Sequence, residues 1–206
     1  GKVGVTGLTL PVGISFYTFQ GMALLLDVRH GRTLPPKRLT DVLLYIAFFP
    51  QLVAGPILRY EDFAPQLDAP RPDWSARAMG LRRFIGGLSK KVLLAGSLGV
   101  MADGVMAALP AGDAPTAWLG LIAYGLQIYL DFSGYCDMAV GLGRMLGFTL
   151  PENFDLPYTA ASLQDFWRRW HMTLQQWLRD YVYIPLGGSR SGHTARNLLI
   201  VFALTG

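Results

Sequence analysis

Cysteine and histidine are scarce in this sequence, which has one cysteine and three histidines among 206 residues. A single cysteine, Cys136, excludes an internal disulfide and a metal cage built from cysteines, so we interpret it as a small buried apolar residue. His171 has no second histidine near it in the sequence, and the acids Asp131 and Asp137 fit no metal motif. We therefore expect no bound metal.

Charge is also in short supply. Only 16% of the residues are charged and 51% are hydrophobic, and the mean hydropathy is +0.32. Because this exceeds what a soluble domain needs to fill its core, the composition predicts a polytopic membrane protein. We expect membrane lipid as a partner and no nucleic acid. The sequence shows no internal repeat, no low-complexity tract and no removable signal peptide, so residues 1–206 are expected to be a single membrane-embedded domain, incomplete at both ends.

Long uncharged runs mark the expected membrane segments. Residues 3–26 carry no charge, and 24 helical residues reach about 36 Å, enough to cross roughly 30 Å of hydrocarbon with some tilt. The other apolar runs are shorter or carry a single charge, and they are residues 42–58, 92–112, 114–130 and 197–206. The last of these is expected to be a further span that is cut short. The sequence thus predicts an all-α, multi-pass protein.

The basic residues predict how these segments are oriented. Seventeen of the 18 lie in three stretches, residues 29–38, 59–91 and 144–196. The positive-inside rule places all three on the cytoplasmic side. Residues 42–58 then have a basic stretch on each side, so we favour a re-entrant segment, whose helix is broken by Pro50 and by Gly55 with Pro56.

The rest of the chain follows from the same rule. We expect residues 92–110 to cross outward and residues 114–130 to return, with an acidic outer loop at residues 103–113. Residues 131–160 contain acids among glycines, which suits short, tilted or half-buried helices near the cytoplasmic face. Residues 65–73 are predicted to be a loop.

One histidine lies within a helix rich in tryptophan and arginine. This helix is expected to begin at a capping box and to end at a turn, formed by Ser162 with Asp165 and by Pro185, Gly187 and Gly188. At helical spacing, the residues that share its apolar face are Trp167, Trp170, His171, Leu174, Trp177, Leu178 and Tyr181. The imidazole of His171 is therefore the one group on this face that titrates near neutral pH.

Two interpretations of His171 are open. An imidazole can act as a general base, because it can take a proton from an attacking hydroxyl near pH 7. A histidine on a Trp-rich face can also be a satisfied polar group of the membrane interface. We interpret Trp167, Trp170 and Trp177 as aromatic interface anchors rather than as residues that stack on a substrate.

The charged residues are open to similar alternatives. Arg168, Arg169 and Arg179 form a solvated or headgroup-facing basic side, or they hold the phosphates of an acyl donor. Asp131 and Asp137 lie where a charge costs about 3 kcal/mol or more if the site is at bilayer depth. Each of these acids should therefore face protein or a water-filled cavity.

Four motifs follow one another along the chain. They are FFPQLVAGPILRYEDF (residues 48–63), YLDFSGYCDMAVGLGRMLGF (129–148), NFDLPY (153–158) and DFWRRWHMTLQQWLRDYVYIPLGGSR (165–190). Together they resemble the membrane-bound O-acyltransferase (MBOAT) family, and within it the bacterial alginate O-acetyltransferase branch. Since four ordered motifs are more specific than any single one, the resemblance favours the catalytic interpretation of His171.

The resemblance implies a ring of transmembrane, tilted and re-entrant helices around a thin-waisted tunnel in the bacterial inner membrane. The acyl donor, acetyl-CoA or an acyl-carrier species, would be a substrate arriving from the cytoplasm, with no bound cofactor, and the hydroxyl acceptor would arrive from the other side. His171 matches one of the two polar active-site residues of the family. The second, a histidine in a Trp-His-Gly setting, is expected beyond Gly206, so residues 1–206 alone are expected to be inactive. Further residues expected to contact substrate or line the tunnel are Asp131, Ser133, Asp137, Trp167, Trp170, Arg168, Arg179, Asp180 and Tyr181.

The leading hypothesis is transfer of an acetyl group to the hydroxyls of an exported polysaccharide, most nearly alginate, with periplasmic or membrane acetylation proteins as partners. Such a reaction needs a base, stabilisation of an oxyanion and exclusion of water. Peptidoglycan or teichoic acid is an alternative acceptor within the family. A rival of another class is a transporter or flippase that uses Asp131, Asp137 and His171 as a substrate or proton path, although the sequence lacks the paired repeats typical of such folds.

Cysteine labelling tests the re-entrant segment. In the complete protein with Cys136 replaced, single cysteines at Lys37 and Pro70 should react with a membrane-impermeant reagent only from the cytoplasmic side, because basic stretches flank residues 42–58 on both sides. A cysteine at Gly112 should react only from outside and serves as the control. If Lys37 and Pro70 react from opposite sides, residues 42–58 are an ordinary span.

Overall fold

The computed structural model describes residues 13–52, 54–68, 72–108, 113–190 and 192–205. All the regular structure in these ranges is helical, apart from one isolated antiparallel bridge between Phe154 and Trp170. The elements, in order, are α1 (Ile14–Arg29), α2 (Leu39–Ile46), η1 (Phe49–Gln51), α3 (Tyr60–Leu67), α4 (Trp74–Ser89), η2 (Lys90–Ala95), α5 (Gly96–Ala108), α6 (Ala114–Leu146), η4 (Pro157–Thr159), α7 (Leu163–Arg169), α8 (Met172–Leu178), η5 (Arg179–Tyr183) and α9 (Thr194–Thr205). The prediction of an all-α chain is confirmed for the part that the structure describes.

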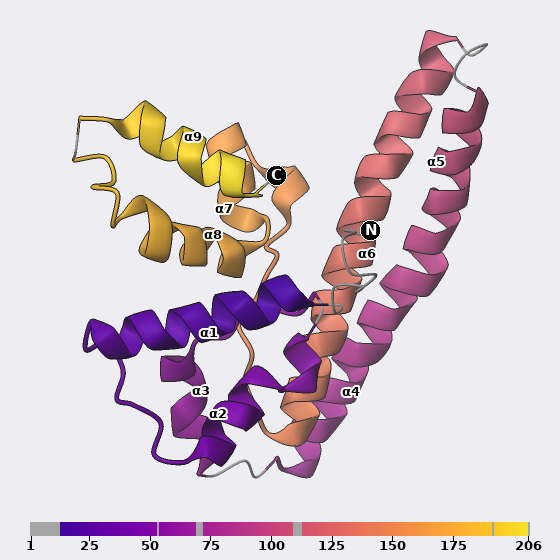
Figure 1. Ribbon diagram of the computed structural model, residues 1–206. Helices are drawn as coiled ribbons and strands as arrows, with labels where there is room; N and C mark the ends of the chain where they lie inside the picture. Colours follow the sequence, from indigo (N-terminus) through magenta and orange to yellow (C-terminus); the bar gives the residue numbers. More distant parts are fainter. Residues whose placement is uncertain (1–12, 53, 69–71, 109–112, 191, 206) are drawn as a thin grey trace, which may run out of the picture. The chain divides into compact units, whose positions relative to one another are not determined.

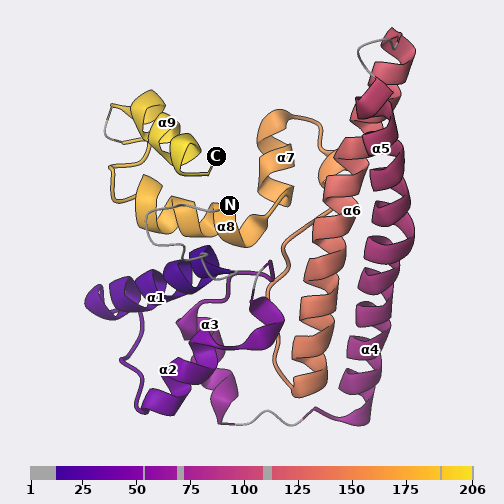
Figure 2. The same ribbon diagram turned by 45° about the vertical axis from the view of Figure 1, so that its right-hand side comes forward.

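The chain divides into two compact units. One comprises residues 1–69 and 151–206, and the other comprises residues 70–150. The second unit is a helical hairpin: α4, η2 and α5 continue into one another and lie alongside α6 (Figures 1 and 2). Its middle turn, η2, is π-helical, with a wider turn than the α-helices on either side.

Glycines set the distance between the two arms of the hairpin. A Cβ atom on Gly80 would lie 2.6 Å from the backbone oxygen of Gly141, and one on Gly87 would lie 2.5 Å from that of Gly134. Real Cβ atoms do not approach an oxygen this closely, so a side chain at any of these positions would force the helices apart. Small residues that let two backbones touch are a common means of packing helices in membranes.

Ion pairs cross the hairpin beside these glycines. The Asp137 carboxylate accepts hydrogen bonds from Arg83 Nη2 at 2.9 Å and from Lys90 Nζ at 2.6 Å, and Lys91 pairs with Asp131. The side chain of Asp137 is 18% exposed, which confirms that this acid faces protein. That of Asp131 is 49% exposed, so its charge is compensated by Lys91 rather than by enclosure.

Two expectations for this part of the chain are wrong. Residues 131–146 do not form short separate helices, because α6 continues through them for 33 residues in all and ends at Gly147, whose φ is 92°. The helix expected at residues 92–110 begins earlier than predicted, at Trp74, because residues 74–91 are helical as well. In both places a charge that would interrupt a membrane helix on its own is paired with one on the opposite arm.

One helix in the described residues, Trp74–Ala108, is long and apolar enough to cross a membrane, with a mean hydropathy of 1.4 in its most apolar window. Two shorter apolar helices occur at Leu39–Gln51 and Thr194–Leu204. The second begins three residues before the segment expected from residue 197. The number of crossings stays a prediction.

In the first unit, α1 packs on the segment that contains α8. The Phe19 and Trp177 rings lie with their centroids 4.5 Å apart, and the Trp177 indole N–H donates to the Phe19 carbonyl at 3.1 Å. Ala23, Ile57 and Leu178 complete the buried cluster. The helix predicted at residues 3–26 is present from Ile14 and extends to Arg29, while residues 3–12 lie outside the described part.

The break predicted in residues 42–58 is confirmed. Helix α2 ends at Ile46, and in the described residues between it and Arg59 the regular structure is limited to the short turn η1. Two carbonyls in this segment are satisfied by buried side chains: Tyr45 O–H donates to Leu58 O at 2.8 Å, and Gln51 Nε2 donates to Tyr45 O at 2.6 Å. Such bonds allow irregular backbone to lie away from water. The prediction of a loop at residues 65–73 is wrong for its first residues. Residues 65–67, including Pro65, belong to α3.

The glycine contacts lead to a test of the hairpin. Gly87→Ala should lower the free energy of unfolding by about 1–3 kcal/mol, because the new methyl group must displace the backbone of α6. Gly86→Ala is the matched control: its Cβ would meet no atom within 4 Å, so this change should leave stability unaltered or raise it by up to about 1 kcal/mol. Unfolding of the complete protein in detergent measures both. Equal effects of the two substitutions would contradict the close contact.

Candidate active site

The helix predicted around His171 is broken at that residue. Helix α7 ends at Arg169, Trp170 is extended with φ −101° and ψ 126°, and α8 begins at Met172. His171, between them, has φ 45° and ψ 53°, in the left-handed region that non-glycine residues rarely adopt. The single apolar face proposed for residues 167–181 is therefore wrong.

The break arises from pairing with an earlier segment. Phe154 and Trp170 form the antiparallel bridge. On one side of it the Asp155 N–H donates to Arg169 O at 3.0 Å, and on the other the Met172 N–H donates to the carbonyl of Asn153 at 3.0 Å. These bonds take backbone groups that a continuous helix would use, so the helix ends and restarts.

The sequence predicts where the helical segment around His171 begins and ends, at Ser162 and at Pro185 to Gly188, and both ends are confirmed. Ser162 caps α7, because its Oγ accepts the Asp165 N–H at 3.1 Å. At the other end, η5 stops at Tyr183 and turns follow, in which Gly187 and Gly188 have φ of 95° and 54°. These are local hydrogen-bond and backbone preferences, and short-range sequence patterns report them well.

The three tryptophans have different surroundings. Trp170 packs edge-on against Phe154, with ring centroids 5.1 Å apart, and stacks on Phe166 at 5.5 Å. Trp177 is 5% exposed and belongs to the core, so its assignment as an interface anchor is wrong. Trp167 is 43% exposed.

His171 lines an apolar hollow of about 950 Å³. The wall consists of residues from α7, α8 and α9, namely Gln164, Trp167, Trp170, Leu174, Gln175, Leu178, Ala195, Leu198, Leu199, Val201 and Phe202. Burial in this setting lowers the pKa of His171 from 6.5 to about 4. At pH 7 the imidazole is thus neutral, which is the form that a general base requires.

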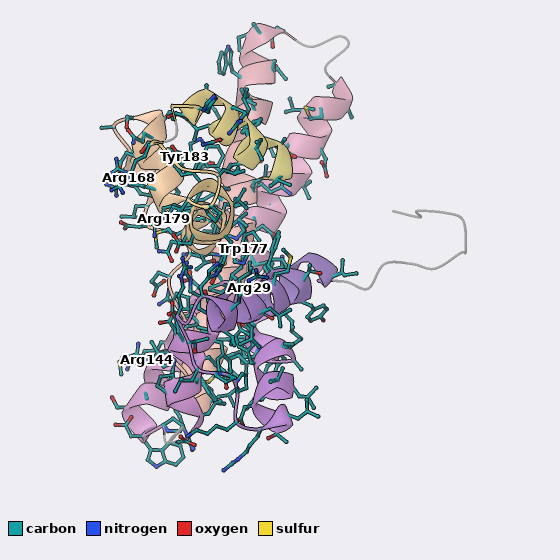
Figure 3. All side chains as sticks on the ribbon, turned by 60° about the vertical axis from the view of Figure 1, so that its left-hand side comes forward. Arg29, Arg144, Arg168, Trp177, Arg179 and Tyr183 are labelled. Atoms are coloured by element: carbon teal, nitrogen blue, oxygen red, sulfur yellow. The ribbon has the colours of Figure 1, made fainter. Side chains whose placement is uncertain are left out.

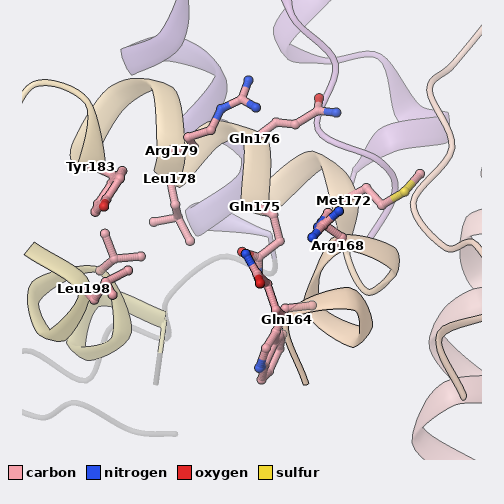
Figure 4. Close-up of a pocket in the computed structure, with 11 residues that line it drawn as sticks. Gln164, Arg168, Met172, Gln175, Gln176, Leu178, Arg179, Tyr183 and Leu198 are labelled. Carbon is pink, nitrogen blue, oxygen red and sulfur yellow. The ribbon is translucent and has the colours of Figure 1, made fainter. Parts of the chain in front are cut away.

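A second hollow, of about 470 Å³, shares a wall with the first. Gln164, Trp167, Gln175, Leu178, Leu198 and Val201 line both of them. The second adds two guanidinium groups, those of Arg168 and Arg179, which project on the same side of the unit in Figure 3. In Figure 4, Arg168 and Gln175 gather beside Gln164, while Leu198 of α9 faces Tyr183. The site therefore combines an apolar chamber that contains a base with a neighbouring one that can attract an anion.

Ion pairs hold the arginine side of the site in place. The Asp180 carboxylate pairs with Arg59 and accepts a hydrogen bond from Arg179 Nε at 2.8 Å. Next to it, the Tyr181 hydroxyl donates to Asp27, a residue that is 1% exposed, at 2.6 Å. The Arg59 guanidinium lies 5.5 Å from the centroid of the Tyr181 ring. Asp180 thus binds both Arg59 and Arg179, while Tyr181 binds Asp27 and lies against Arg59.

The expected site residues are distributed over both units. The structure brings together His171, Trp167, Trp170, Arg168 and Arg179 around the two hollows. Asp131, Ser133 and Asp137 belong to α6 in the other unit, where Ser133 is 3% exposed and its hydroxyl has no hydrogen-bond partner among the described residues.

Several residues of the site were not anticipated from the sequence. Gln164 and Gln175 line both hollows, and Asn153 binds the backbone at the break. The only signal for Asn153 was its place in NFDLPY, one of the four motifs, which carried no indication of what it contacts. Within the described residues, no group of three His, Cys, Asp or Glu side chains is arranged to hold a metal ion.

Comparison with known proteins places this chain in a class of membrane enzymes. Residues 36–206 match the profile of MBOAT, the membrane-bound O-acyltransferase family. The chain belongs to this family.

Individual relatives share most of the chain. The probable alginate O-acetylase AlgI of Pseudomonas syringae pv. tomato is 46% identical over 204 residues, which are 98% of this chain and 39% of the relative. The protein of the same name from Azotobacter vinelandii is also 46% identical, over 98% of this chain and 41% of its own length. The peptidoglycan O-acetyltransferase of Helicobacter pylori is 38% identical over 97% of this chain and 43% of its own length. The chain thus spans about two fifths of the length of these relatives.

The lowered pKa of His171 has a measurable consequence for stability. Between pH 6.5 and about 4 the unfolded chain binds a proton at His171 and the folded chain does not. The free energy of unfolding should therefore decrease as the pH falls through this range. NMR of histidine-labelled protein should show His171 neutral down to about pH 4. Its signal is assigned by its absence in His171→Gln. A midpoint near 6.5 for that signal would mean that the imidazole is not buried in the hollow.

Proposed function

We propose that the complete protein transfers an acetyl group from a cytoplasmic donor to hydroxyl groups of an exported polysaccharide, most nearly alginate. The observation that carries this proposal is the position of His171, a neutral base in the wall of an apolar hollow of about 950 Å³. Membership of the membrane-bound O-acyltransferase family and the AlgI relatives support the same reaction.

In this reaction His171 acts as the general base. It takes the proton of the acceptor hydroxyl as that oxygen attacks the carbonyl carbon of the donor, so a new C–O bond forms. The bond from that carbon to the leaving group of the donor then breaks, and the proton passes from the imidazole to the leaving group. An apolar wall favours transfer over hydrolysis, because it excludes water from the reacting carbonyl.

The arginine hollow is suited to the donor. Acetyl-CoA or an acyl-carrier species carries phosphate groups, and guanidinium groups bind phosphate through paired N–H donors. Arg168 is exposed and Arg179 is held by Asp180, so one cation is free to adapt and the other is fixed. The shared wall would place a phosphate on one side and the acyl group beside His171 on the other.

The membrane setting of the proposal is a ring of transmembrane, tilted and re-entrant helices in the bacterial inner membrane, crossed several times by the chain. The candidate span Trp74–Ala108 and the broken segment at residues 42–58 support it. An exported acceptor requires that the polymer reach the enzyme from the far side, and this favours periplasmic or membrane acetylation proteins as partners. The alternative acceptor is peptidoglycan, which is supported by the 38% identity to the peptidoglycan O-acetyltransferase of Helicobacter pylori.

Replacement of His171 tests the reaction. In the complete protein, His171→Ala should leave membrane insertion intact and lower acetyl transfer at least about 100-fold, the effect of losing an acid/base group. His30→Ala is the control, because His30 is exposed at the end of α1 and should tolerate the change with full activity. Transfer to alginate and to peptidoglycan, measured in parallel with labelled donor, identifies the acceptor.

The same assay tests whether the arginine hollow binds the acyl donor. Arg168→Gln should raise the KM for the donor and leave kcat nearly unchanged, since it removes binding that is equal in the ground and transition states. Arg190→Gln, in an exposed turn, is the matched control.

If His171→Ala retains near wild-type transfer, His171 is a structural residue and the proposal is wrong.

A further inference from the structure

His171 is held in a backbone conformation that it does not favour. Among the residues that the structure describes, Leu156 and His171 are the two non-glycine residues in the left-handed region, with φ of 43° and 45°. This region costs an ordinary residue about 1–2 kcal/mol, so it persists where the surroundings impose it. Both residues belong to one pairing, in which residues 153–155 run antiparallel to residues 169–172: His171 lies within it and Leu156 follows it directly.

The N-terminus of α8 is capped from outside the helix. His171 is its N-cap residue, yet no hydrogen bond from the His171 side chain caps α8. The capping acceptor is instead Asn153 Oδ1, which takes the Thr173 N–H at 3.2 Å and the Thr173 hydroxyl at 2.9 Å. A backbone N–H can only donate, so the Asn153 atom that faces it must be the amide oxygen. An N-cap side chain usually accepts a hydrogen bond from the first turn of its helix. Because Asn153 accepts this bond, the His171 imidazole does not have to.

A third element completes this arrangement. The Thr173 hydroxyl, which donates to Asn153, also accepts the Ile57 N–H at 2.9 Å. Asn153, Thr173 and Ile57 are 1%, 4% and 5% exposed, so water cannot replace these bonds. The hydrogen bonds run in one direction: the Ile57 N–H donates to the Thr173 hydroxyl, and this hydroxyl donates to Asn153 Oδ1. Loss of one partner would leave a buried polar group unsatisfied.

We propose that Asn153 is the positioning residue of His171. It caps α8 in place of the histidine, fixes the left-handed turn through its backbone carbonyl and its side chain, and so directs the imidazole into the hollow. Thr173 extends this support to the segment at Ile57. The inference rests on the proposed function for its kinetic readout, but the position of the imidazole can be measured without it.

Paired substitutions in the complete protein test the role. Asn153→Ala removes the acceptor, whereas Asn153→Asp keeps an oxygen at the same place. Thr173→Val removes the hydroxyl at nearly constant volume, whereas Thr173→Ser keeps it. We expect Asn153→Ala and Thr173→Val to lower kcat by about 10- to 100-fold, as a misplaced catalytic group does, with the KM values for both substrates within about twofold of wild type. Asn153→Asp and Thr173→Ser should recover most of the loss.

The second readout is the NMR titration of His171. In Asn153→Ala and Thr173→Val its midpoint should move from about 4 toward 6.5, because an imidazole that leaves the hollow regains water. If these variants fold and leave both kcat and the midpoint unchanged, the proposal is wrong. If Asn153→Ala fails to fold, the comparison of Thr173→Val with Thr173→Ser decides. An active His171→Ala would overturn the proposed function alone, since the midpoint shift would still report the positioning.

Discussion

The pairing of residues 153–155 with residues 169–172 is the interaction on which the site depends. It ends α7, turns the chain through His171 and starts α8 in a new direction. Without it, residues 162–183 would satisfy their backbone groups best as one helix. The cost of the left-handed conformation at His171, about 1–2 kcal/mol, is offset by the four hydrogen bonds that join Asn153 and Asp155 to residues 169–173, since each contributes about 1 kcal/mol. The position of the imidazole is therefore a property of two segments, and neither could set it alone.

The sequence predicts most helices and misjudges where some of them end. Apolar runs are local, and they identify α1, α5 and α9, just as Pro50 and Pro56 identify the break after α2. The errors occur where a local signal is cancelled by a distant residue. Asp137 suggests the end of a membrane helix, but Arg83 and Lys90 on the other arm neutralise it and α6 continues. No pattern within a window of 20 residues contains that information.

The site shows the same division. The Ser162 cap depends on residues three apart, and the sequence reveals it. The break at His171 depends on Asn153, 18 positions earlier in the chain, and the residues around His171 have ordinary helix propensity, so a continuous helix was the natural expectation. The importance of His171 came from the resemblance to a family. Its neighbours in the hollow, such as Gln164 and Leu198, could be found only from the folded chain.

The π-helical turn η2 governs the phase of the 35-residue helix Trp74–Ala108. The buried residues along this helix are Gly80, Gly87, Ala95, Gly99 and Ala102. Their spacings are 7, 8, 4 and 3, so a heptad seam carries one extra residue between Gly87 and Ala95. An α-helix would rotate the seam off its partner at that point, whereas a π-turn absorbs the insertion. The buried face of this helix therefore follows a seven-residue repeat before and after η2, and the repeat is shifted by one residue within η2. Lys90 and Lys91 lie at this shift. A chain shortened by one residue there would keep the seam straight but lose the geometry that lets two adjacent lysines reach Asp137 and Asp131.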